Sequence, residues 1–134
     1  MMSDAYLFML GNNRYCGVNP YITLTKLSVW IINNPTTEFP VSLSYGVNYL
    51  LITDIKSSTE FHMTLKDLDN NVTLVDENIT YTNPVTYFGY LTFGGMRYPK
   101  SDIGDQLVGS IFLDQTKVIN TETNELIWGA DTKL

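Results

Sequence analysis

The clearest pattern in the chain is an alternation of apolar and polar residues between positions 60 and 68. One phase is apolar and the other polar: Phe61, Met63 and Leu65 against His62, Thr64 and Lys66. Successive side chains of a strand point to opposite faces of a sheet, so this period of two predicts a strand with one buried face. The polar run 67–71 then predicts a turn, and residues 72–81 predict the second strand of a hairpin.

Further short apolar segments are separated by Gly, Asn and Pro, which favour turns. The pattern predicts strands at 5–10, 21–32, 47–55, 85–93, 106–114, 117–119 and 125–128 and a short edge piece at 39–41, with breaks at 11–13, 17–20 and 33–35. A change of phase near Lys26 predicts a bulge inside the long strand 21–32. Because Pro40 cannot donate a backbone hydrogen bond, the piece 39–41 is expected at a sheet edge.

Eight or nine short strands joined by turns, with no helical periodicity, are typical of a sandwich or barrel. The composition agrees, since the chain holds 16 Thr, 10 Ile, 9 Val and 9 Tyr but only 2 Ala. β-branched and aromatic residues favour strands. We therefore predict an all-β protein, an antiparallel β-sandwich forming a single domain over residues 1–134. Trp30 and Trp128 are expected to anchor its core.

The net charge of the chain limits the classes of partner that are expected to bind it. Fourteen acidic side chains against eight basic ones give a net charge of −6, and no cluster of Lys or Arg offsets it. A phosphate backbone or an anionic membrane repels such a surface, so neither is expected as a partner. The single cysteine allows no disulfide within the chain, and no segment resembles a signal peptide or a membrane span. A cytoplasmic location is expected.

Several blocks of the chain, read in order, resemble a family of small bacterial and phage proteins catalogued as a domain of unknown function. They are AYLFML at 5–10, KLSV at 26–29, FP at 39–40, YLLI at 49–52, FHMTLKDLDN at 61–70, and the segment 104–114. Gln115 stands where the family's late strand continues into Gly. The resemblance covers most of the chain and implies an immunoglobulin-like or C2-like sandwich. It implies no activity, no cofactor and no catalytic residue.

A cation site is the first chemical candidate. Asp67, Asp69 and Asn71 place three oxygen ligands at alternating positions, as a calcium loop requires. Asp102 and Asp105 are candidates for a second set, because C2-like sandwiches bind calcium from two loops. The residues at positions six and twelve of the loop do not fit an EF-hand. A turn in which these side chains bond their own backbone is the favoured interpretation, and no cofactor is expected.

Catalysis is the second candidate. Cys16 and His62 are the only cysteine and histidine in the chain, and a nucleophilic thiol needs a base within hydrogen-bond reach. No motif surrounds Cys16, so a small buried cysteine and a solvated strand histidine are favoured. Asp76 and Glu77 are adjacent in a predicted strand and would point to opposite faces. We therefore expect no enzymatic activity.

An aromatic segment at 87–98 is the strongest candidate for a binding surface. Its aromatic residues occupy both phases of the predicted strand, and an arginine follows. The candidate site residues are Tyr87, Phe88, Tyr90, Phe93, Arg97 and Tyr98. Exposed aromatics beside an arginine are typical of an interface hot spot. A central strand buried on both sides remains the alternative.

The leading functional hypothesis is a non-enzymatic binding module that acts through a protein partner or through self-association. A phage virion or assembly component is the first alternative. A protein that sequesters a small ligand or nucleotide in phage–host conflict is the second, because the aromatic surplus permits stacking.

Overall fold

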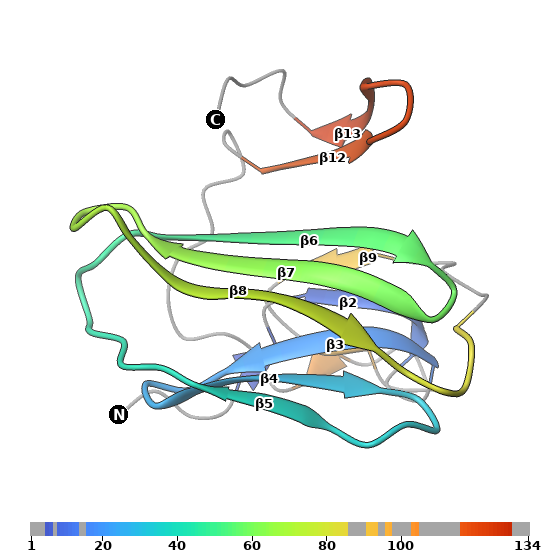
Figure 1. Ribbon diagram of the computed structural model, residues 1–134, viewed down its shortest axis with the longest axis horizontal. Helices are drawn as coiled ribbons and strands as arrows, with labels where there is room; N and C mark the ends of the chain where they lie inside the picture. Colours follow the sequence, from blue (N-terminus) through green and yellow to red (C-terminus); the bar gives the residue numbers. More distant parts are fainter. Residues whose placement is uncertain are drawn as a thin grey trace.

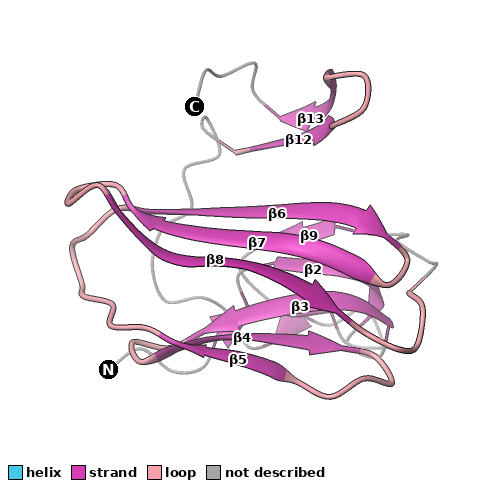
Figure 2. Cartoon of the chain, in the orientation of Figure 1, coloured by secondary structure: helices cyan, strands magenta, loops and turns pink. Residues whose placement is uncertain are grey.

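The computed structural model describes residues 5–6, 8–13, 16–85, 91–93, 96–97, 103–104 and 116–129, with side chains for 18, 20, 22–85 and 116–129. Within these ranges the chain forms strands and turns only (Figure 2). The strands are β1 (Ala5–Tyr6), β2 (Phe8–Asn13), β3 (Cys16–Ile22), β4 (Lys26–Ile31), β5 (Thr37–Pro40), β6 (Tyr49–Ser57), β7 (Glu60–Asp67), β8 (Val72–Thr80), β9 (Leu91–Phe93), β10 (Met96–Arg97), β11 (Ile103–Gly104), β12 (Lys117–Asn120) and β13 (Glu125–Gly129). The described residues include no helix that could span a membrane.

Two antiparallel sheets face each other (Figure 1). The first has the order β5-β4-β3-β2-β9, and β1 also pairs with β3. The second is the meander β6-β7-β8, in which consecutive strands are neighbours. Two further antiparallel pairs, β10–β11 and β12–β13, form two-stranded ribbons of their own.

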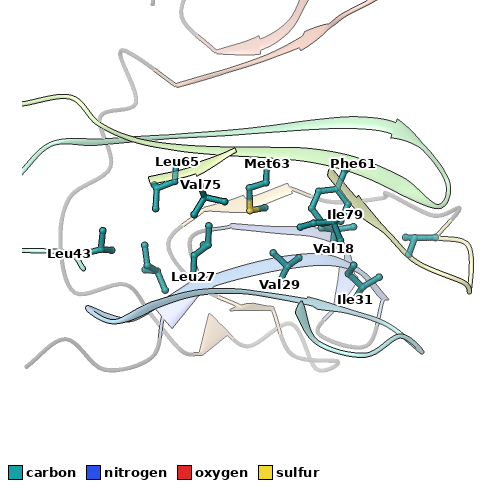
Figure 3. Packing of buried hydrophobic residues seen from close by; sticks show 12 residues of the cluster. Val18, Leu27, Val29, Ile31, Leu43, Phe61, Met63, Leu65, Val75 and Ile79 are labelled. Carbon is teal, nitrogen blue, oxygen red and sulfur yellow. The ribbon is translucent and has the colours of Figure 1, made fainter. Parts of the chain in front are cut away.

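The apolar phases of both sheets meet in one core (Figure 3). Its fully buried members come from β3, β4 and β7: Val18, Leu27, Val29, Ile31, Phe61, Met63 and Leu65. Val75 and Ile79 of β8 complete the second sheet's contribution. The prediction of an all-β protein built from antiparallel strands around one buried face is confirmed, and so is the alternation predicted for β7.

The predicted long strand 21–32 is wrong. The chain turns at Thr23, whose backbone N–H donates to the carbonyl of Lys26 at 2.9 Å. The Thr23 hydroxyl also accepts from the backbone N–H of Thr25 and of Lys26, at 3.2 and 3.1 Å. A threonine hydroxyl that bonds the backbone two or three residues ahead stabilises a turn. The change of phase near Lys26 therefore marks a hairpin between β3 and β4 in place of a bulge.

The predicted breaks at 11–13 and 17–20 are also wrong, because these residues lie inside β2 and β3. Pro20 pairs with Val29 of β4 and is fully buried. On the other side of β3, Tyr21 faces Tyr6 of β1 and Val18 faces Leu10 of β2. Pro20 thus lies between the stretches that pair with β1 and with β2, where its missing N–H costs least.

Two polar contacts join segments that are far apart in the sequence. Asn34, in the turn after β4, donates its amide to the carbonyl of Asn83 at 3.0 Å and accepts from the Asn83 N–H at 3.0 Å. Asn83 follows β8, so this pair connects the two sheets at one end.

The predicted edge position of residues 39–41 is confirmed. Strand β5, which ends at Pro40, is the edge strand of the first sheet.

Candidate functional site

The predicted aromatic site lies largely outside the described residues. Tyr87, Phe88, Tyr90 and Tyr98 are not among them, and only the backbones of Phe93 and Arg97 are. Phe93 ends β9 and pairs with Phe8 of β2 at the edge of the first sheet. Arg97 lies on β10 and pairs with Ile103 of β11 within the ribbon β10–β11. The binding role of this segment stays a prediction.

The predicted cation loop is a hydrogen-bonded turn. Asp67 accepts from the backbone N–H of Asn70 at 2.9 Å and from its side-chain amide at 2.8 Å. Asp69 accepts from the backbone N–H and the side chain of Asn48, at 3.0 and 3.1 Å. Asn71 takes a positive φ of 54° at the end of the turn. Both carboxylates are therefore used to close the β7–β8 hairpin and to hold the loop before β6.

The electrostatics of this turn agree with that role. The side-chain and backbone hydrogen bonds from Asn70 lower the pKa of Asp67 below its usual value. Among the described residues, no three His, Cys, Asp or Glu side chains lie close enough together to hold a metal ion. Asp102 and Asp105, the candidates for a second ligand set, lie outside the described residues.

The hypothetical pair of Cys16 and His62 is not formed. Cys16 lies on β3 in the first sheet and His62 on β7 in the second. Met63 and Phe61 of β7 point into the core, so His62 between them points to the outer face of its sheet, away from β3. The imidazole therefore lies on the face of its sheet that is turned away from the strand carrying Cys16.

His62 instead joins β7 to β8. Its Nε2 lies 2.5 Å from Oδ1 of Asp76, and its Nδ1 lies 2.6 Å from Oδ1 of Asn78. The hydrogen bonds to Asn78 and Asp76 raise the pKa of His62 above its usual value. Glu77 pairs with Met63 while Asp76 pairs with Thr64, so the two adjacent carboxylates alternate between faces as predicted.

The second notable surface is the ribbon β12–β13, where three consecutive apolar side chains of β13 are exposed. Leu126 is 41% exposed, Ile127 64% and Trp128 45%. The expectation that Trp128 anchors the core is wrong. Trp30 is half-buried on the face of β4 opposite Val29 and Ile31, so it does not belong to the buried core either.

A bulge places apolar residues on both faces of this ribbon. Val118 pairs with Trp128, and Ile119 pairs with Leu126, so that Ile127 is an extra residue on β13. Directly paired residues share a face and successive pairs alternate, so one face carries Val118 and Trp128 and the other Ile119 and Leu126. In Figure 1 the ribbon lies outside the two facing sheets. The run of three consecutive apolar residues at 126–128 was the sequence signal for this surface.

Together these features define a class of protein: an all-β, two-sheet fold with a polar cross-strand cluster on the outer face of β7 and β8 and an exposed apolar ribbon. The nucleophile and base that the sequence offered lie on different sheets. No protein-family model, no curated protein and no solved structure matches the chain. The fold and the two surfaces are therefore the basis for assigning a function.

Proposed function

We propose that this protein is a non-enzymatic binding module that acts through contacts with another protein. The observation that carries the proposal is the ribbon β12–β13, where Leu126, Ile127 and Trp128 follow one another and are all exposed. The proposal keeps the expected cytoplasmic location and the immunoglobulin-like or C2-like type of sandwich.

Leaving the apolar side chains of such a ribbon in water costs free energy. A hairpin of two short strands is only marginally stable alone. Burying one large aliphatic side chain contributes about 1.5 to 3 kcal/mol, so covering Leu126 and Ile127 would favour association. Fully buried interface centres are apolar and rich in aromatic residues, which fits Trp128. The acidic balance of the chain favours a partner whose surrounding surface is neutral or basic.

Site-specific photo-crosslinking tests the proposal. A photoreactive phenylalanine analogue replaces Ile127 in the full chain, and the matched control carries it at Thr73, an exposed position on β8. We expect irradiation in the source cells to give a protein adduct of discrete mass from position 127 and none from position 73. The proposal fails if position 127 gives no adduct and the purified protein is a monomer at every concentration measured.

The mass of the adduct separates the alternatives. An adduct with a different protein supports a hetero-partner module. An adduct between copies of this chain, together with a large and fixed stoichiometry in light scattering, supports the virion or assembly component. An adduct between copies with a dimer in light scattering supports a self-associating module.

A further inference from the structure

The outer face of β7 and β8 carries a cross-strand cluster that the proposed function does not use. β8 ends the second sheet as the structure describes it, and β7 is its sheet neighbour. His62 of β7 reaches two residues of β8, Asp76 and Asn78, which lie on the same face. The His62 side chain is 31% exposed and that of Asp76 64%, so solvent protons reach the cluster.

The chemistry of the imidazole ring decides what this geometry means. A neutral imidazole has one N–H donor and one lone pair, whereas an imidazolium ion has two donors. Both ring nitrogens of His62 lie within hydrogen-bond distance of an oxygen, one from a carboxylate and one from an amide. Two oxygen acceptors are satisfied together only by the doubly protonated ring.

We propose that His62 is a proton-dependent clamp, which as imidazolium fastens β8 to β7 through Asp76 and Asn78 and which loosens β8 when the proton leaves. The neutral ring keeps one N–H, so one of the two contacts is lost unless Asn78 turns its amide to donate. The charge-assisted contact to Asp76 also becomes a neutral one, which is weaker.

The charged groups around the clamp favour the protonated ring on balance. The charged residues that the structure describes on the face of His62 are Glu60 and Lys66 on β7, Asp54 and Lys56 on β6, and Asp76 on β8. Lys56 lies 2.6 Å from Asp54, which offsets much of its repulsion toward the ring. The hydrogen bonds to Asn78 and then to Asp76 raise the pKa of His62, against the smaller opposing effects of burial and Lys56.

The direction of the pH effect follows from the raised pKa of His62. The clamp's contribution to holding β8 is fully present below about pH 6.5, the usual value for histidine, and is lost as the pH rises through the higher folded value. Local opening of an edge strand frees backbone N–H and C=O groups that another strand can pair with. The clamp would therefore make access to β8 depend on pH in the neutral range.

The chain offers a clean experiment because His62 is its only histidine. One imidazole C–H resonance in a proton NMR titration reports its midpoint, and amide exchange, corrected for intrinsic rates, reports the protection of β8. We expect a midpoint above 6.5 and protection in β8 that falls about two- to fivefold across it, the range for an exposed ion pair. In Asp76→Asn the midpoint should move to lower pH.

Two variants make the result decisive. His62→Gln keeps a hydrogen-bonding side chain without a titrating group, so the pH step in β8 protection should vanish. Lys66→Gln changes a charge on the same strand and face, and the step should remain. The proposal is overturned if protection of β8 is flat across the His62 midpoint, or if His62→Gln shows the same step as the parent protein.

Discussion

Two tyrosines that pack against the core differ in whether their hydroxyls have a hydrogen-bond partner. The hydroxyl of Tyr49 accepts a hydrogen bond from the backbone N–H of Ser44 at 2.9 Å. The hydroxyl of Tyr81 is buried and has no partner among the described residues, and burial raises its pKa. The Tyr81 ring still packs on Phe61, with 6.0 Å between ring centroids. A buried hydroxyl without a partner costs free energy, whereas its ring contributes by packing.

The two tyrosines therefore give opposite predictions. Tyr81→Phe should raise the free energy of unfolding by about 1 kcal/mol, because it removes a polar atom that is desolvated without compensation. Tyr49→Phe should lower it by about 1 kcal/mol, because the Ser44 N–H loses its acceptor. Urea unfolding measures both. A loss of stability in Tyr81→Phe would mean that its hydroxyl has a partner.

The lowered pKa of Asp67 predicts that its turn is sensitive to acid. Hydrogen bonds from Asn70 lower its pKa, so its contribution to stability is present above the unfolded value of about 4 and is lost as the pH falls through the folded one. The loss of stability from pH 5 to pH 2, measured by urea unfolding, should be smaller in Asp67→Asn than in the parent. Glu77→Gln, an exposed change on β8, is the control and should follow the parent curve.

At the scale of elements, the sequence pattern predicted those strands whose apolar and polar residues alternate or form a short apolar run. The alternation in 60–68 gave β7 and its buried face, and the segments 117–119 and 125–128 correspond to the hairpin β12–β13. The turn at Thr23 was missed because apolar residues continue on both sides of it, so periodicity alone does not distinguish one long strand from two. The hydroxyl of Thr23 was the available signal.

The His62 cluster could not be predicted because a bulge moves the register of β8. Asp67 pairs with Val72 and Lys66 with Thr73, so counting back from the turn places His62 opposite Glu77. A register shift between Leu65 and Lys66 adds one residue to β8, and His62 then pairs with Asn78. One extra residue thus exchanges which side chains share a face.

The backbone conformation of Gly129 predicts that a substitution at this position disrupts the ribbon β12–β13 selectively. It has a φ of +101°, and an added Cβ would overlap the carbonyl oxygen of Thr116 and lie 2.8 Å from Cα of Lys117. Gly129→Ala should therefore abolish amide protection in residues 117–128 and leave that of β6-β7-β8 unchanged. Gly46→Ala is the matched control, since its φ is +76° but its Cβ would meet no atom within 4 Å. Intact ribbon protection in Gly129→Ala would contradict the described strand pairing.

At the scale of the whole molecule, the two sheets depend on one shared core. Phe61 is fully buried between them and packs among residues of both sheets (Figure 3). Composition and alternation were sufficient to predict such a core, because they report only how much apolar surface must be covered. They could not place the apolar ribbon outside it, because sequence alone does not tell an exposed Trp128 from a buried one.

Phe61→Ala should lower the free energy of unfolding by about 3 to 5 kcal/mol, the usual cost of deleting a buried phenylalanine. Because domains are stable by only about 5 to 15 kcal/mol, this loss is a large fraction of the total. Ile52→Ala is the control: Ile52 is 44% exposed on β6, and its truncation should cost about 0.5 kcal/mol. Equal losses in the two variants, measured by urea unfolding, would contradict the sandwich.

The pairing of β2 with β9 also determines the order in which the protein can be completed on the ribosome. Leu10 pairs with Leu91, so this contact closes a loop of about 80 residues, whereas β6-β7-β8 joins neighbours in the sequence. The meander can form as soon as its own strands emerge. The edge of β2 that will receive β9 must wait for residues 91–93, and until then the nascent chain carries an open template for mispairing with its neighbours on the polysome.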